Sequence, residues 1–199
     1  MNQTGKSLLF WITLVVVGVA IYNLASVFER MEAQRGGGEA PLAEVDPAAK
    51  LKELGIVLAP PTAPIANYVN AVRTGNLLFL AGKGPLPKDG KDVVGRLGKD
   101  MTVDEGYQAA RSVAIAHLAV LQHELGDLKR VRRIVKVLGM VNSDPAFTQQ
   151  PAVVNGYSDL LVAVFGDRGK HARSAVGMAT LPGGIPVEVE VIVEIDPIR

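Results

Sequence analysis

The chain has 199 residues, with 21 basic and 20 acidic side chains and a formal net charge of +1. This near-neutral balance, without a stripe of lysine and arginine between aromatic residues, argues against nucleic acid as a partner. Cysteine is absent, which excludes disulfides and thiolate chemistry, and the widely spaced His117, His123 and His171 predict no metal site.

The first expected element is a transmembrane helix over residues 8–28, after an N-terminal flank of residues 1–7. The segment carries no charged residue, and at a helical rise it spans roughly 30 Å, the thickness of a bilayer core. Trp11 and Tyr22 lie toward its two ends, where aromatic rings prefer the interface. We interpret it as a retained single-pass helix in the lipid bilayer. A cleaved signal peptide is the alternative, but the apolar run is long for one and no clear cleavage site follows.

Two arginines, Arg30 and Arg35, follow this segment, whereas Lys6 precedes it. The positive-inside rule therefore favours a cytoplasmic location for the C-terminal domain. Residues 29–46 contain charges, a triple glycine and proline, which indicates a flexible linker. A single globular domain is expected over residues 47–199.

The first part of this domain predicts a short helix and a β-hairpin. Lys50–Leu54 has helix-forming residues and is followed by Gly55. Tyr68–Arg73 and Leu77–Ala81 are strand-like and flank Thr74-Gly75-Asn76, which is typical of a hairpin. The second of these strands is apolar on both faces, which predicts burial on both.

Two helices and a strand follow. Thr102 and Glu105 have the spacing of a capping box, which predicts a helix that ends before Gly126. Arg132–Val141 is rich in β-branched residues and predicts a strand. Pro151–Phe165 predicts a second helix, with Pro151 at its first turn and Gly166 after its end.

The last two strands alternate with period two. In the first, Val176 and Met178 share one face, and the other face carries Arg173, Ala175 and Gly177. In the second, Val187, Val189, Val191, Val193 and Ile195 share one face, and Glu188, Glu190, Ile192 and Glu194 share the other. An arginine beside small residues suits a carboxylate ligand, because the guanidinium fork matches it bidentately.

These elements predict an α+β domain with the order β-β-α-β-α-β-β, a mixed sheet and two helices packed on one face. We expect the valine face of the last strand to meet the helices. The opposite face is then expected to carry Arg173, Glu188 and Glu190. Apolar residues on that uncovered face predict a closed homo-oligomer.

If the strands that carry Arg173 and Glu188 formed a simple hairpin, the two side chains could not contact one ligand. In a hairpin around Gly183-Gly184, Arg173 would lie opposite a residue near Glu194, roughly 20 Å from Glu188. The two residues can therefore meet a common ligand only if their strands are separated in the sheet or if different subunits supply them.

Several short motifs, in this order and at these spacings, resemble the RidA/YjgF family, also called endoribonuclease L-PSP or chorismate-mutase-like. The resemblance covers roughly residues 56–195. The motifs are Asn67-Tyr68-Val69, Leu80-Ala81-Gly82-Lys83-Gly84-Pro85, Asn155-Gly156-Tyr157, Ala172-Arg173-Ser174, Leu181-Pro182 and Val187-Glu188-Val189-Glu190.

The resemblance implies a Bacillus chorismate-mutase-like fold and a homotrimer with ligand clefts between subunits. It also implies a hydrolase (deaminase) that converts reactive 2-imino or enamine acids to 2-keto acids and ammonia, without a cofactor. In that scheme Arg173 grips the substrate carboxylate and Glu188 positions the attacking water. The cleft is lined by Tyr68, Asn155 and the backbone near Gly82 and Ala175.

Three positions depart from the family pattern. Ala81 replaces a serine, Lys83 replaces a glutamine, and Ala175 replaces a frequent cysteine. Lys83 adds a charge that could bind a second acidic group. The loss of a hydroxyl and a thiol supports an alternative hypothesis, in which the domain is a non-catalytic module that binds small carboxylates or acts as a scaffold at the membrane.

Other readings of the same residues are open. Arg173 could form an interface salt bridge, and Glu188 could be a buried glutamate paired with a basic residue. A Ser174–His171 nucleophile is disfavoured, because neighbouring side chains on a strand point to opposite faces. Ribonuclease and chorismate mutase activities follow from the family labels alone, and the neutral charge argues against the first.

Overall fold

The computed structural model describes residues 45–64 and 66–197. Its elements are α2 (Pro47–Glu53), β1 (Ala71–Thr74), β2 (Leu77–Lys83), α3 (Val103–Leu125), η1 (Leu128–Arg130), β3 (Val131–Asn142), α4 (Gln150–Phe165), η2 (Gly166–Gly169), β4 (Ala172–Met178), η3 (Pro182–Gly184) and β5 (Val187–Ile195). The predicted order β-β-α-β-α-β-β is confirmed, and α2 begins before the predicted Lys50.

The predicted transmembrane helix over residues 8–28 lies outside the described residues, as does most of the linker over 29–46. Within residues 45–64 and 66–197, no helix combines the length and the apolar character needed to span a bilayer.

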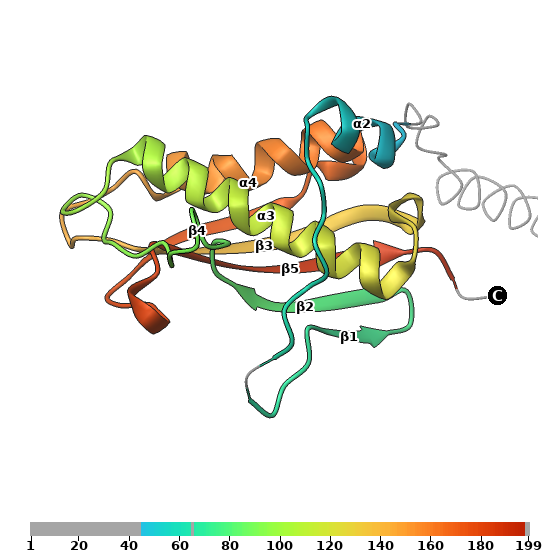
Figure 1. The fold of residues 1–199 in the computed structure, drawn as a ribbon, viewed down its shortest axis with the longest axis horizontal. Coiled ribbons are helices and arrows are strands. Elements are labelled where there is room, and N and C mark those ends of the chain that lie inside the picture. The colour runs from blue at the N-terminus through green and yellow to red at the C-terminus, as the bar shows by residue number, and fades with distance from the viewer. Residues whose placement is uncertain (1–44, 65, 198–199) are drawn as a thin grey trace, which may run out of the picture. The chain divides into compact units, whose positions relative to one another are not determined.

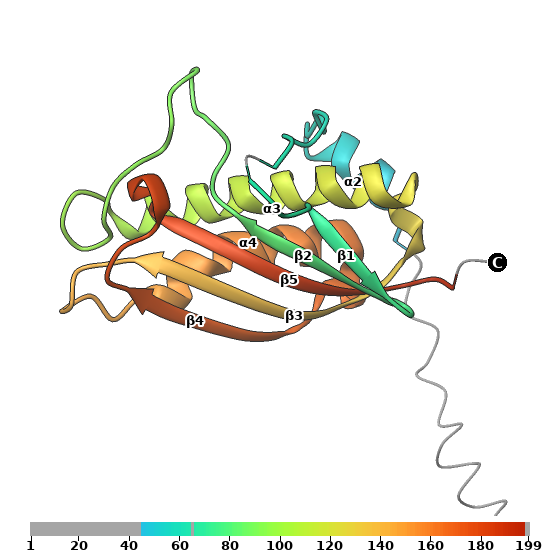
Figure 2. The ribbon, with the colours of Figure 1, turned by 90° about the horizontal axis from the view of Figure 1, so that it is seen from below.

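The five strands form one mixed sheet in the order β1-β2-β5-β3-β4. The β3–β4 pair is parallel, and the other pairs are antiparallel. A parallel pair needs a crossover connection, and α4 supplies it. Figures 1 and 2 show α3 and α4 side by side on one face of the sheet, as predicted, and β1 and β4 at its two edges.

Both long helices begin and end within one residue of the positions that the sequence predicts. The side chain of Thr102 accepts from the backbone N–H of Glu105, and the Glu105 carboxylate accepts from that of Thr102, which completes the capping box. Gly126 follows α3 with φ 75°, and Gly166 follows α4 with φ 62°. Such positive φ values favour glycine, so each helix ends where the next residue lacks a side chain.

The core lies between the helices and the sheet. The inward residues of β5 are almost fully buried, and so are Val137 and Val141 of β3. Two glycines set the spacing of the layers. A Cβ on Gly156 of α4 would lie 2.0 Å from the carbonyl oxygen of Tyr107 in α3, and one on Gly139 of β3 would lie 2.6 Å from Val154. The helices can therefore approach each other and the sheet closely.

One expectation about the faces of the sheet is wrong. Arg173, Ala175 and Gly177 pair with Val137, Gly139 and Val141, and these β3 residues pair with the buried valines of β5. Paired neighbours point to the same side. Arg173 therefore lies on the helix-covered face, and only Glu188 and Glu190 lie on the open face. The physical reason is that β4 pairs with β3 alone, in parallel, so its inward positions follow from β3.

Candidate functional site

Arg173 lies on edge strand β4 and reaches α4. Its Nη1 donates to Asn155 Oδ1 at 2.9 Å and to Ser158 Oγ at 3.0 Å. Ala175, two residues along the same face, packs partly buried against the core. We call Arg173, Asn155 and Ala175 the Arg173 half-site. The structure thus brings together three of the predicted site residues.

The contacts of Arg173 use only one edge of its guanidinium. Both hydrogens of Nη1 have acceptors on α4, and among the described residues neither Nε nor Nη2 has a hydrogen-bond acceptor. Nε and Nη2 form the side-on fork that matches the two oxygens of a carboxylate. The side chain is therefore held by the helix and keeps a bidentate donor edge for a ligand.

Glu188 lies on β5, on the open face, against the backbone of β2. An added Cβ on Gly82 would lie 2.1 Å from Glu188 Oε1, so the carboxylate occupies the space that any other residue at position 82 would fill. Burial, and secondarily the charge of Glu190, raise the pKa of Glu188 above its usual range. We call Glu188 and Gly82 the Glu188 half-site. A carboxylate with a raised pKa is a better proton acceptor at neutral pH.

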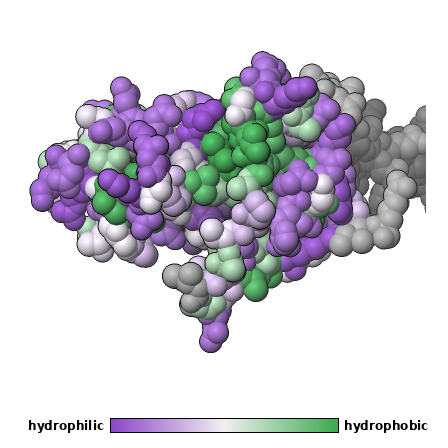
Figure 3. Space-filling model, viewed as in Figure 1, coloured by the Kyte–Doolittle hydropathy of each residue, from purple (hydrophilic) through white to green (hydrophobic). Residues whose placement is uncertain are grey.

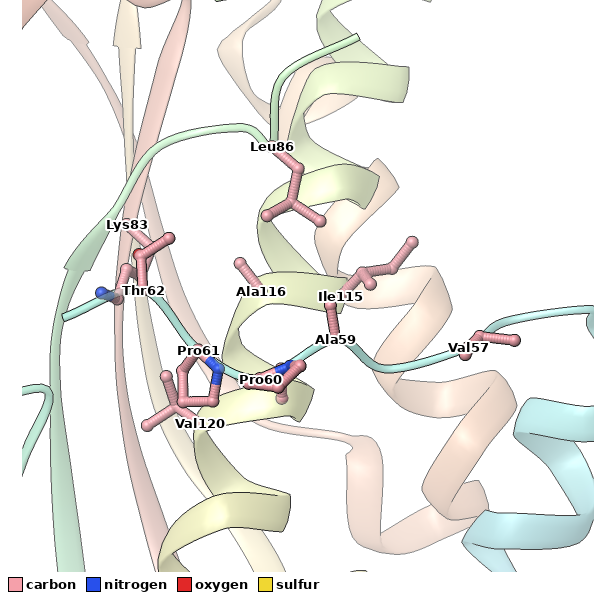
Figure 4. Close-up of a pocket in the computed structure, with 11 residues that line it drawn as sticks. Val57, Ala59, Pro60, Pro61, Thr62, Lys83, Leu86, Ile115, Ala116 and Val120 are labelled. Carbon is pink, nitrogen blue, oxygen red and sulfur yellow. The ribbon is translucent and has the colours of Figure 1, made fainter. Parts of the chain in front are cut away.

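Lys83 does not join Glu188. It pairs with the buried Val189, and its Nζ donates to Asn70 Oδ1 at 2.6 Å. Burial lowers the pKa of Lys83. The side chain lies at one end of a pocket of about 90 Å³, on the helix-covered side, between α3 and the extended segment 57–62 (Figure 4).

This pocket belongs to an apolar patch where the extended segment crosses α3 (Figure 3). Val57, Leu86 and Ile115 contribute to its lining. The patch lies on the opposite side of the sheet from Glu188 of the same chain, and the role of Lys83 toward a second acidic group stays a prediction.

Tyr68 precedes β1 and is 47% exposed. The sequence predicted a strand from Tyr68, but β1 begins only at Ala71. Tyr68 therefore lies before the strand and outside the sheet. Among the described residues, the side chain of Tyr68 makes no hydrogen bond to either half-site. Its neighbour Val69 borders the open face of the sheet.

A buried network that the sequence analysis did not assign supports the Glu188 half-site from behind. His117 is fully buried in α3; its Nδ1 lies 2.8 Å from Tyr157 Oη and its Nε2 lies 3.1 Å from the carbonyl oxygen of Ala81. A carbonyl only accepts, so Nε2 carries the hydrogen and Tyr157 donates to Nδ1. Burial lowers the pKa of His117 to about 4.

The position of this network explains its role. The β2–β5 register shifts between Leu80 and Lys83, so the His117 hydrogen bond satisfies a carbonyl at a bulge. The signal that could have identified His117 is its spacing, three residues after Ala114 and four before Leu121, within the apolar stripe of α3.

The two half-sites are far apart within one chain. Arg173 pairs with Val137, whereas Glu188 pairs with Met140, and β4 and β5 are separated by β3. With strands about 4.8 Å apart and a rise of about 3.3 Å per residue, their Cα atoms lie roughly 14 Å apart. Their side chains also leave opposite faces of the sheet. The strands are separated in the sheet, which is one of the two arrangements that the sequence left open. Because the side chains leave opposite faces, a single chain still cannot place both groups on one small ligand.

The open face of the sheet has the character of an interface. Its exposed apolar side chains come from three strands and include Val72 at 55%, Phe79 at 41% and Val176 at 40% exposure. Phe79, Leu138 and Ile192 line a hollow of about 430 Å³, with Lys136 and Glu190 beside it. Exposed apolar side chains gathered on one sheet face are typical of interaction surfaces.

Among residues 45–64 and 66–197, no group of three or more histidine and carboxylate side chains lies close enough to hold a metal ion.

Comparisons with known proteins agree with this architecture. Residues 48–193 match the model of a family described as "YjgF/chorismate mutase-like, putative endoribonuclease". Protein TCP17 of Trypanosoma cruzi is 47% identical over 150 residues, which cover 75% of this chain and 94% of that protein.

Two solved structures share both sequence and fold with the chain. Protein Atu1372 of Agrobacterium tumefaciens, of unknown function, is 43% identical with a TM-score of 0.70, covering 75% of this chain and 92% of that one. A "putative endoribonuclease" of Shewanella oneidensis MR-1 is 30% identical with a TM-score of 0.72, covering 75% and 99%.

Proposed function

The chain belongs to the YjgF/RidA family, and on that premise we propose that it hydrolyses reactive 2-imino or enamine acids to 2-keto acids and ammonia. The observation that carries the proposal is the state of Arg173. Its guanidinium is anchored to α4 by one nitrogen and offers a side-on fork beyond it. Such a fork selects a small substrate with a carboxylate.

The reaction needs orientation and a proton acceptor more than a Lewis acid. An imine carbon is already electrophilic, so Glu188 takes a proton from water as the oxygen attacks that carbon. Glu188 returns that proton to nitrogen, which gives a carbinolamine. The hydroxyl proton then passes through Glu188 to the same nitrogen, the carbon–nitrogen bond breaks, and ammonia leaves as the carbonyl forms. The raised pKa of Glu188, caused by burial and by Glu190, suits this exchange.

We propose that a homotrimer completes the active site. One subunit supplies the Arg173 half-site and its neighbour supplies the Glu188 half-site. The support is twofold: the two half-sites leave opposite faces of one sheet, and the open face around Phe79 is apolar and exposed. Burial of that face between subunits would bring a β4 edge to a neighbouring β5.

The test is a coupled assay in which an amino-acid oxidase generates 2-imino acids and semicarbazide traps what is not hydrolysed. We expect the chain to reduce semicarbazone formation. Arg173→Ala should lose both binding and turnover, whereas Glu188→Gln should keep 2-keto acid binding and lose turnover. If the chain accelerates hydrolysis of no imine across several amino acids, the proposal fails.

A binding module without turnover is the second candidate. Ala81 and Ala175 lack the hydroxyl and the thiol of the family pattern, which favours this alternative. Thermal stabilisation by a 2-keto acid, without turnover of any imine, would identify it, because a ligand of the native state raises its apparent stability. The related "putative endoribonuclease" suggests RNA instead, but the net charge of +1 offers little attraction to a polyanion.

We further propose that residues 8–28 tether the domain to a membrane, with the domain on the cytoplasmic side. The support is the uncharged run itself and the two arginines that follow it. Protease protection of the domain in sealed membranes, compared with lysed ones, tests both the anchorage and the side.

A further inference from the structure

A line of hydrogen bonds connects the start of β4 to Arg173. His171 Nδ1 lies 2.6 Å from the carbonyl oxygen of Gly169, and His171 Nε2 lies 3.0 Å from Ser158 Oγ. The same Oγ lies 3.0 Å from Arg173 Nη1. Ser158 enters the function proposed above only as an acceptor for Arg173, and His171 has no role in it.

These hydrogen bonds can run in one direction only. The Gly169 carbonyl accepts, so His171 carries its hydrogen on Nδ1 and its Nε2 accepts. Burial lowers the pKa of His171; the hydrogen bond to Gly169 acts in the opposite direction, and the charge of Arg173 adds to the lowering. The net lowering favours the neutral ring that this direction requires. Ser158 therefore donates its hydroxyl hydrogen to Nε2, and its oxygen is left to accept from Arg173.

The backbone that starts this line is closely packed. A Cβ on Gly169 would lie 2.3 Å from the carbonyl oxygen of Leu161, so only glycine lets η2 lie against α4 at this point. Gly169 is also buried. The carbonyl that orients His171 is therefore fixed relative to the helix that carries Ser158.

We infer that Ser158 and His171 are positioning residues, which set the plane of the Arg173 guanidinium so that its Nε–Nη2 edge faces the ligand carboxylate. Asn155 alone would hold Nη1 at one point and leave the group free to pivot. The second acceptor removes that freedom, and His171 fixes the direction in which the acceptor points. The inference rests on the proposed function for its substrate, but the fixed guanidinium is a property of the chain alone.

The spacing of Ser158 and His171 also resembles that of a nucleophile and its base. The position of Arg173 argues for a different role, because its N–H already occupies a lone pair of the serine oxygen. Covalent labelling of Ser158 by a fluorophosphonate would identify a nucleophile and overturn the positioning role.

The experiment compares Ser158→Ala, Ser158→Thr and His171→Phe in the full chain. Ser112→Ala is the matched control, because Ser112 also accepts a hydrogen bond, from the backbone of Leu86, on the other helix. Ser158→Ala should raise KM for the imine about tenfold with kcat nearly unchanged, and Ser158→Thr should restore KM to within about twofold of the original. In the Ser158→Ala background, His171→Phe should add nothing.

A second measurement does not depend on turnover. Phenylglyoxal reacts with the terminal nitrogens of arginine, and peptide mass spectrometry gives the rate at Arg173. We expect Ser158→Ala and His171→Phe to raise that rate several-fold over the Ser112→Ala control. A raised rate in a chain that neither binds 2-keto acids nor hydrolyses imines would support the positioning role and refute the proposed function. Unchanged labelling and unchanged KM in both variants would overturn the inference and leave the proposed function standing.

Discussion

Glu188 and Gly82 form a contact that can be tested with a single methyl group. The nearest atoms to an added Cβ at position 82 belong to the end of the Glu188 side chain, which is flexible and can move. Gly82→Ala should therefore displace the carboxylate rather than unfold the chain. We expect kcat to fall about a hundredfold while the free energy of unfolding changes by less than about 1 kcal/mol.

Steady-state kinetics and urea denaturation measure the two effects. The check on the cause is the double variant Gly82→Ala/Glu188→Gln, which should be no slower than Glu188→Gln alone. A further loss in the double variant would mean that Gly82 acts through something other than Glu188.

Glu190 provides a test of the electrostatics of Glu188. Burial and, after it, the charge of Glu190 raise the pKa of Glu188. A base works in its ionised form, so the rate should fall as the pH drops through this raised pKa. Glu190→Gln removes the like charge, lowers the pKa of Glu188, and should move the acid limb of kcat/KM to lower pH. Glu194→Gln, roughly 20 Å from Glu188 along the strand, should leave the profile in place.

At the scale of elements, the His117–Tyr157 network joins both helices to the bulge in β2. His117 has a pKa of about 4 in the folded chain against an ordinary value of 6.5. Between these values the unfolded chain binds a proton that the folded chain does not. Folding stability from this group is therefore complete above pH 6.5 and decreases as the pH falls toward 4, by roughly 3 kcal/mol in total.

Urea denaturation of the original chain and of His117→Gln, across this pH range, measures the effect. Glutamine can donate to the Ala81 carbonyl and accept from Tyr157 without titrating. We expect the stability difference between the two proteins to change by that amount between pH 7 and pH 4. A difference that does not vary with pH would show that His117 is not the titrating group.

Local signals determined most of these elements before the structure was known. The capping box at Thr102 and the glycine after α3 act through neighbouring backbone atoms, so both predicted boundaries hold. The face of Arg173 was predicted wrongly, because alternation along a strand shows which residues share a face but not which face meets the helices. That depends on the partner strand, and β4 pairs with β3 alone, across a crossover.

The residues of the candidate site also divide into those that local sequence motifs predict and those that depend on tertiary packing. Arg173 and Asn155 belong to two separate sequence motifs, and the crossover through α4 places them in contact. The sequence did not predict roles for His117, Ser158 and His171, because the contacts Tyr157–His117 and Ser158–His171 form only through tertiary packing. A polar residue inside an apolar helical stripe was the one local indication of such a network.

At the scale of the whole molecule, the open face of the sheet is the surface through which we propose that the trimer assembles. Phe79→Lys would place a charge in the apolar hollow beside Leu138 and Ile192. We expect the variant to be monomeric and inactive, since the half-sites would no longer meet. Light scattering after size-exclusion chromatography gives the mass. Val57→Lys is the control: Val57 is 90% exposed on the helix-covered side and should leave assembly unchanged.

The division of Arg173 and Glu188 between opposite faces of the sheet has a genetic consequence. Two inactive chains, Arg173→Ala and Glu188→Gln, should complement each other when they are unfolded together, mixed in equal amounts and reassembled. In the proposed trimer, each cleft needs an intact arginine from one subunit and an intact glutamate from the next, and each is present with a chance of one half. About a quarter of the original activity should return. A cell that expresses both variants would then retain function that a cell expressing either one alone lacks.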